Sequence, residues 1–215
     1  MPSNTRTKLP NALTLSRVAL AAAFFAVLSL RTGLHARSGP PDLWLIAAAV
    51  IFILAALTDV LDGHLARRWG VVSTFGRIMD PFADKVLVLG AFVYLAGPGF
   101  LETVQIDGRD VRLQVSGVAA WMAVAVIARE LLVTSIRAVF ESRGIDFSAG
   151  WAGKFKMILQ SLAIPLILLI LALTEPTQGT LWRPLIDSLV WLTVLVTLWS
   201  GVPYIRRAAA GLQSA

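Results

Sequence analysis

The chain has 215 residues, of which 57% are hydrophobic and 15% are charged, and its mean hydropathy is +0.74. These values lie outside the range of soluble domains and favour an integral membrane protein. The net charge of +6 also fits nucleic-acid binding, but an uneven distribution of Lys and Arg over membrane loops explains it better. Because the sequence has no Cys, disulfides and thiolate metal sites are excluded.

Six runs without a charged residue predict six transmembrane helices. The runs have 13 to 18 residues, whereas a helix needs about 20 to cross the hydrocarbon core, so each must recruit polar residues at its ends. They cover residues 18–30, 43–58, 86–101, 113–128, 157–174 and 188–205. We therefore expect an all-α integral membrane protein with a single membrane domain over residues 1–215.

The first predicted helix ends near Leu30, and either Asn11 or Thr14 is a candidate cap for its start. We interpret it as a retained span, because no small-residue cleavage site of a signal peptide follows it. The other helices are predicted over about 43–68, 75–96, 115–142, 152–173 and 185–207. In the longest loop, 97–114, the alternation around Asp107 and Gly108 predicts a small β-hairpin.

The basic residues are distributed unevenly over the two sides of this arrangement. With the N-terminus inside, 14 of the 19 Lys and Arg lie in inner segments and five lie in outer loops. Such a bias is typical of bacterial membrane proteins whose inner loops face the cytoplasm. Both termini are therefore predicted to be cytoplasmic.

Four aspartates lie near the inner ends of the second and third predicted helices. Asp59 and Asp62 are three residues apart, and Asp80 and Asp84 are four apart, so each pair shares one helix face. A short turn joins the two helices, which makes them antiparallel neighbours. The four carboxylates are thus expected to converge near the inner membrane surface, in a cavity that opens to the cytoplasmic side.

Four carboxylates at one place require compensating charge. Mg²⁺ or Mn²⁺ suits a set of oxygen ligands, and a pair of such ions would suit transfer at phosphorus. The alternative is that these aspartates are helix-end charges that reach for water. Gly63 and Ala66 count against it, because their small side chains leave space over the face that carries Asp59 and Asp62.

The pattern D-x2-D-G-x2-A-R-x8-G-x3-D-x3-D runs from Asp59 to Asp84. It resembles the signature of the CDP-alcohol phosphatidyltransferases at every fixed position, and the six-span layout agrees along nearly the whole chain. The resemblance implies a membrane enzyme that binds a CDP-linked lipid, transfers its phosphatidyl group to an alcohol and releases CMP. It also implies a homodimer, in a bacterial inner membrane with the active site facing the cytoplasm.

The resemblance further implies roles for individual residues. Metal binding would fall to Asp59, Asp62, Asp80 and Asp84, with Asp84 also acting as the general base. The CDP site would consist of Asp59, Asp62, Gly63, Ala66, Arg67 and Gly76. The metal ions and Arg67 would neutralise the pyrophosphate of the substrate.

A second polar cluster bears on the identity of the acceptor. Arg129 follows sixteen uncharged residues, and Arg137 lies eight residues further along the same predicted helix, while Lys154 and Lys156 open the next one. Charges at membrane depth usually face a cavity or a partner, although positive-inside anchoring explains part of this cluster equally well. A basic pocket of this kind fits an anionic acceptor such as glycerol 3-phosphate.

Three shorter stretches resemble the phosphatidylglycerophosphate synthase branch of the same family. They are PNALTLSR (10–17), ARELLVTSIR (128–137) and GKFKM (153–157). Further candidate contacts to the substrate are Asn11, Thr14, Arg17 and Thr58. For the first three, a helix cap and an interfacial anchor is an equally good interpretation.

Other functions remain open at this point. A cardiolipin synthase, whose acceptor is phosphatidylglycerol, shares the signature, and so does any other CDP-alcohol phosphatidyltransferase with a different acceptor. A divalent-cation transporter would use the same carboxylates, but it predicts a polar path to the outer face, and the helices over 43–68 and 75–96 have few polar residues there. The leading hypothesis is a Mg²⁺- or Mn²⁺-dependent enzyme that binds CDP-diacylglycerol and glycerol 3-phosphate and does not bind nucleic acid.

Overall fold

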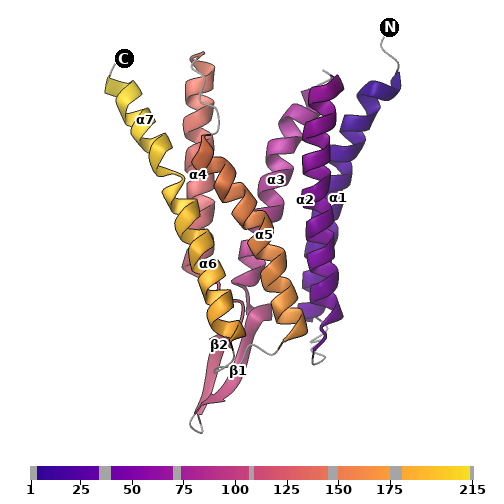
Figure 1. Ribbon diagram of the computed structural model, residues 1–215, viewed down its shortest axis with the longest axis vertical. Coiled ribbons are helices and arrows are strands. Elements are labelled where there is room, and N and C mark those ends of the chain that lie inside the picture. The colour runs from indigo at the N-terminus through magenta and orange to yellow at the C-terminus, as the bar shows by residue number, and fades with distance from the viewer. Residues whose placement is uncertain are drawn as a thin grey trace. The chain divides into compact units, whose positions relative to one another are not determined.

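The structure is a computed structural model that describes residues 4–33, 40–69, 74–106, 109–144, 150–174 and 181–213. Within these ranges, the side chains of residues 4–14, 33, 59–69, 74–81, 83–84, 104–106 and 211–213 lie outside the description. The helices are α1 (Asn4–Gly33), α2 (Leu43–Trp69), α3 (Thr74–Leu95), α4 (Ala120–Ser142), α5 (Trp151–Leu173), α6 (Trp182–Trp199) and α7 (Val202–Gln213) (Figure 1). A 3₁₀ turn (Pro98–Phe100) leads into β1 (Leu101–Ile106) and β2 (Arg109–Gln114).

The chain divides into two compact units. The first unit consists of Met1–Tyr94 and Ile164–Pro176, and the second unit consists of Leu95–Ala163 and Thr177–Ala215. The chain passes from one unit to the other inside α5, one residue before Pro165. Proline has no N–H to donate to the carbonyl four residues earlier, so the helix lacks one backbone hydrogen bond at this point.

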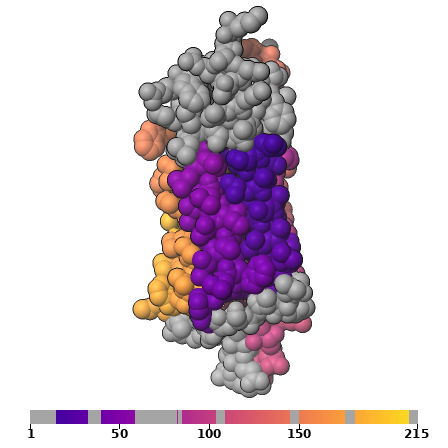
Figure 2. Space-filling model, turned by 90° about the vertical axis from the view of Figure 1, so that its right-hand side faces the viewer, coloured from indigo at the N-terminus to yellow at the C-terminus, as the bar shows by residue number. Residues whose placement is uncertain are grey.

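In the first unit, α1 and α2 pack side by side (Figure 2). The buried residues of α1 recur every three or four positions, at Arg17, Ala21, Phe24 and Leu28. Opposite them α2 buries Leu45, Ala48, Ala49, Phe52 and Ala55. Phe24 and Phe52 meet edge to face with ring centroids 5.7 Å apart, while the alanines allow the backbones to approach closely.

Asp42 lies where α1, α2 and the end of α5 meet in the first unit. Its carboxylate accepts hydrogen bonds from the backbone N–H groups of Trp44 (3.0 Å) and Leu45 (3.2 Å), so it caps α2. The same carboxylate pairs with Arg31 of α1 at 2.7 Å, and its own N–H bonds to the carbonyl of Ala172. One buried residue thus joins α1, α2 and the end of α5.

In the second unit, β1 and β2 form the antiparallel hairpin that the sequence predicts, with Ile106 opposite Arg109. The Asp-Gly turn itself lies outside the described residues. The chain then turns at Gly117, whose φ of +71° favours glycine, and a Cβ there would lie 2.7 Å from Asp187 Oδ1. This turn explains why α4 begins at Ala120 and not near residue 115 as predicted.

The helix boundaries correct two further predictions. Because α1 begins at Asn4, Asn11 and Thr14 lie inside the helix and neither caps it. The helix predicted over 185–207 is two helices, since α6 ends at Trp199 and α7 begins at Val202. Gly201 and Pro203 are the sequence signal for this break, since a glycine followed by a proline commonly ends one helix and begins the next.

Within the described residues, three helical segments are long and apolar enough to cross a membrane, namely Leu15–Thr32, Trp151–Leu173 and Trp182–Ala210. Shorter apolar helices cover Leu43–Thr58 and Lys85–Leu95. Large apolar side chains such as Leu162 (64% exposed) and Leu195 (57% exposed) line the outside of these helices. Such surfaces are unfavourable in water and suit contact with lipid chains, so the structure supports a mostly helical membrane protein.

Candidate active site

The signature residues lie on helices, as the spacing argument requires. Asp59 and Asp62 lie towards the end of α2, and Asp80 and Asp84 lie in the first half of α3. An α-helical backbone at all four positions places each pair on one helix face. The side chains of Asp59, Asp62, Gly63, Ala66, Arg67, Gly76, Asp80 and Asp84 lie outside the described residues. Their convergence on metal and CDP therefore stays a prediction.

The additional candidates near the signature have different surroundings. Arg17 is 1% exposed and continues the buried stripe of α1, which fits a role inside the protein better than that of an interfacial anchor. The Thr58 hydroxyl donates to the carbonyls of Leu54 (2.9 Å) and Ala55 (2.8 Å) of its own helix. The side chains of Asn11 and Thr14 lie outside the described residues.

The second unit contains a buried ionic cluster near the middle of α4. Glu130 Oε1 accepts hydrogen bonds from Arg129 Nη1 at 2.7 Å and from Lys156 Nζ of α5 at 2.6 Å. The three side chains are only 8–12% exposed. Burying charge is costly unless it is paired, so the pairing of two cations with one carboxylate is the arrangement that burial demands.

Two neighbouring contacts connect this cluster to α6. Arg129 Nη2 donates to Ser200 Oγ at 2.7 Å, and Ser200 in turn donates to the carbonyl of Thr197 at 2.6 Å. Gln160 Nε2 of α5 donates to Thr197 Oγ1 at 3.0 Å. A continuous polar network therefore joins α4, α5 and α6 inside an otherwise apolar interior.

Of the four predicted acceptor residues, the structure brings only Arg129 and Lys156 together. Arg137 lies two turns further along α4, about 12 Å by helical rise, and pairs with Glu141 at 3.5 Å. Lys154 is exposed. Arg137 or Lys154 would have to move its side chain before it could contact a phosphate held by Arg129 and Lys156.

Sequence reasoning missed the uncharged members of the network. Gln160, Thr197 and Ser200 are at most 2% exposed, and each lies inside a run that was described only as uncharged. Their polarity within the runs 157–174 and 188–205 was the available signal. A polar group inside a membrane span needs a partner, and these three partner one another or Arg129.

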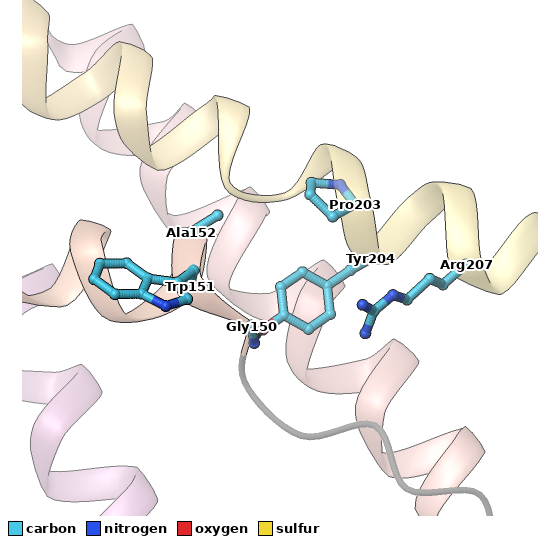
Figure 3. Close-up of a pocket in the computed structure, with 6 residues that line it drawn as sticks. All are labelled: Gly150, Trp151, Ala152, Pro203, Tyr204 and Arg207. Carbon is cyan, nitrogen blue, oxygen red and sulfur yellow. Dashed lines mark hydrogen bonds between the residues drawn. The ribbon is translucent and has the colours of Figure 1, made fainter.

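A small pocket lies between the start of α5 and the start of α7 (Figure 3). Its volume is about 140 Å³, and its lining residues are Gly150, Trp151, Ala152, Pro203, Tyr204 and Arg207. Tyr204 reaches across from α7, and its hydroxyl accepts the N–H of Gly150 at 3.2 Å. Small-molecule sites usually enclose 300–1,000 Å³, so this pocket is too small for a whole substrate.

Comparison with known proteins covers both the signature and the buried cluster. The family model described as CDP-alcohol phosphatidyltransferase matches residues 7–199. The chain belongs to the CDP-alcohol phosphatidyltransferase family. The match includes α1 to α6 except for the first residues of α1, so both units are part of the family domain.

Several curated relatives are similar over nearly the whole chain. A protein of Bacillus subtilis named CDP-diacylglycerol–glycerol-3-phosphate 3-phosphatidyltransferase is 32% identical, covering 93% of this chain and 94% of the relative. A protein of Escherichia coli K12 with the same name is 33% identical over 95% of this chain and 96% of its own. A Mycobacterium tuberculosis protein named "Probable phosphatidylglycerophosphate synthase" is 32% identical over 93% of this chain and 81% of its own.

Proposed function

We propose that this member of the family transfers the phosphatidyl group of CDP-diacylglycerol to glycerol 3-phosphate, giving phosphatidylglycerophosphate and CMP. The observation that carries the proposal is end-to-end similarity to relatives named for this reaction, in a chain that fills every signature position. The buried pair of Arg129 and Lys156 agrees with it, because a phosphorylated acceptor needs cations to bind it.

The donor end of the reaction belongs to the signature helices. The four aspartates offer only carboxylate oxygens on a helical backbone, and this donor set fits Mg²⁺ or Mn²⁺, with two ions as our proposal. When bound, the ions supply positive charge for the pyrophosphate of the substrate. Arg67 is proposed to hold the same pyrophosphate, and Gly63, Ala66 and Gly76 to leave room for CDP.

The proposed step is a displacement at the phosphorus atom that carries the diacylglycerol group. An acceptor hydroxyl oxygen forms the new bond to this phosphorus, the bond from phosphorus to the bridging oxygen breaks, and CMP leaves with that bonding pair. Asp84 is proposed to take the hydroxyl proton, for which its carboxylate must come within hydrogen-bond reach of the acceptor. Asp84 lies in α3, one turn after Asp80, so base and metal ligands share one helix face.

We also propose the finer topology, with six spans, both termini in the cytoplasm and the site facing the cytoplasm of a bacterial inner membrane. It is supported by the 14 of 19 basic residues that fall in inner segments. The apolar part of α2, Leu43–Thr58, is about 24 Å long against a core of about 30 Å. Asp59 would then lie at the inner headgroups, where a lipid pyrophosphate meets a water-soluble acceptor. A homodimer, implied by the family resemblance, completes the proposal.

The test is release of CMP by the purified protein from CDP-diacylglycerol, with Mg²⁺ or Mn²⁺ and one acceptor at a time. We expect release with glycerol 3-phosphate. Release only with phosphatidylglycerol would instead identify a cardiolipin synthase. Folded protein that releases no CMP with any acceptor, but carries Mn²⁺ into liposomes, would make the chain a cation transporter.

A further inference from the structure

The side chain of Arg129 is held from two sides by residues outside the family signature. On one side, Glu130 accepts from Nη1 at 2.7 Å and also fixes Lys156. On the other side, Ser200 accepts from Nη2 at 2.7 Å, from the end of α6. Ser200 is itself oriented, because its hydroxyl hydrogen goes to the Thr197 carbonyl. The guanidinium plane is therefore fixed by two residues on different helices.

The break between α6 and α7 provides the space in which Arg129 lies. A Cβ placed on Gly201 would be 3.4 Å from Arg129 Cγ, 3.6 Å from its Nε and 3.3 Å from the carbonyl oxygen of Leu198. These distances are at or below ordinary van der Waals contact. The Nε is buried, and among the described residues it has no hydrogen-bond partner. A methyl group at Gly201 would therefore just touch this part of Arg129, and a larger side chain such as leucine would displace it.

A clamp whose only purpose is to join helices does not explain this arrangement. An apolar cluster of the same volume is usually at least as stable as a buried ion pair, and it leaves no orphaned donor such as the Nε of Arg129. A fixed guanidinium, by contrast, presents its planar fork to a phosphate with little loss of side-chain entropy on binding. The geometry is that of a prepared anion-binding group.

We propose that Glu130, Ser200 and Gly201 are positioning residues that hold Arg129, and through Glu130 also Lys156, for the phosphate of the acceptor. This inference rests on the proposed function, since it names the parts of the acceptor site. It adds the α6–α7 break to the functional elements of the chain. It also gives Glu130 a role in phosphate binding, although its carboxylate has the same sign of charge as the ligand.

The direction in which the KM for glycerol 3-phosphate changes shows whether Glu130 positions the two cations or only balances their charge. If Glu130 acts only as a counter-ion, Glu130→Gln raises the local positive charge and lowers the KM for glycerol 3-phosphate. If it positions the cations, Glu130→Gln and Glu130→Asp both raise that KM, because aspartate keeps the charge but withdraws the carboxylate by one methylene. We expect rises of about tenfold, equivalent to about 1.4 kcal/mol.

The experiment measures kcat and both KM values for the wild type and for Glu130→Asp, Glu130→Gln, Ser200→Ala and Gly201→Leu. The KM for glycerol 3-phosphate should rise in all four variants, by less in Ser200→Ala, which removes one hydrogen bond. The KM for CDP-diacylglycerol should stay within about twofold. Asp187→Asn is the matched control, because it also removes a carboxylate from an arginine pair of the second unit, at 3.0 Å. Its KM values should equal those of the wild type.

A second acceptor tests whether the effect acts through the phosphate. With glycerol in place of glycerol 3-phosphate, the four variants should resemble the wild type, whereas a general loss of structure would lower turnover with both acceptors. An unchanged or lowered KM for glycerol 3-phosphate in folded Glu130→Asp and Ser200→Ala overturns the inference. Titration calorimetry of glycerol 3-phosphate with the same proteins keeps the two proposals apart. If the wild type is inactive but binds glycerol 3-phosphate more tightly than Glu130→Asp does, only the proposed reaction is refuted. If the wild type does not bind glycerol 3-phosphate, the proposed positioning role is refuted.

Discussion

Replacement of Asp42 should destabilise the first unit more than any single substitution of an exposed charge. Its carboxylate caps α2 through two backbone N–H groups and pairs with Arg31, and the side chains of the pair are 6% and 11% exposed. Asp42→Ala removes both functions at once. It leaves the N–H groups of Trp44 and Leu45 without the Asp42 acceptor and removes the buried Asp42 carboxylate from Arg31.

The size of the effect follows from these two parts. Loss of a helix cap costs about 1 kcal/mol, and removal of one partner from a buried ion pair costs about 3–5 kcal/mol. Because Arg31 keeps a little access to solvent, we expect the lower end, or about 3–4 kcal/mol in total for Asp42→Ala. At about 2–4 °C per kcal/mol for a chain of this size, the unfolding midpoint falls by about 10 °C.

Three further variants separate the two parts. Asp42→Asn retains a good cap and loses only the ion pair, so it should be about 1 kcal/mol more stable than Asp42→Ala. Arg31→Met should cost less than either, because the helix N-terminus still stabilises the Asp42 carboxylate. Glu141→Gln is the control, since its pair with Arg137 is 38% and 55% exposed and contributes about 0.5 kcal/mol or less.

The assay is thermal unfolding of the purified protein in one detergent, followed by intrinsic Trp fluorescence and circular dichroism. The reasoning is refuted if Asp42→Ala unfolds within about 2 °C of Glu141→Gln. It is also refuted if Arg31→Met is more damaging than Asp42→Ala, because the cap would then contribute nothing.

Three other predictions concern the hairpin junction, the proposed base and the topology. Gly117→Ala should lower the unfolding midpoint by several degrees, since φ is +71° and the new Cβ meets Asp187 Oδ1; a midpoint equal to that of Gly150→Ala, where a Cβ meets nothing within 4 Å, would contradict it. Asp84→Asn should reduce kcat by at least about 100-fold while Mn²⁺ binding, followed by electron paramagnetic resonance, is largely retained; full activity would exclude Asp84 as the base. Because the sequence has no Cys, a cysteine introduced at Gly108 should react with an impermeant maleimide from outside intact spheroplasts, and one at Ser214 only after lysis; the reverse pattern would invert the proposed topology.

The helices and the family were predictable from sequence because both depend on local pattern. Uncharged runs located most of the helices, and the alternation around Asp107 and Gly108 located the hairpin. The start of α4 was misplaced, because the turn at Gly117 depends on contacts with α6 and not on the adjacent sequence. The break at Gly201 was missed although Gly201 and Pro203 are a local signal for it, because the uncharged run 188–205 continues through both.

The same difference between local patterns and long-range contacts applies to the candidate site. The aspartate signature is a short-range pattern on two consecutive helices, so its positions were readable from spacing. The acceptor cluster joins three helices that are distant in sequence, and spacing alone grouped Arg137 with Arg129 although Arg137 pairs with Glu141. Glu130 adjoins Arg129 in the sequence, but its contact with Lys156, twenty-six residues away, required the fold.

The most direct test of the account is CMP release by the purified wild-type protein from CDP-diacylglycerol in the presence of Mg²⁺ or Mn²⁺, with and without glycerol 3-phosphate. The account predicts metal-dependent release that requires glycerol 3-phosphate and yields phosphatidylglycerophosphate as the lipid product. Folded protein that releases CMP only with an acceptor lacking a phosphomonoester, or releases none at all, would contradict it.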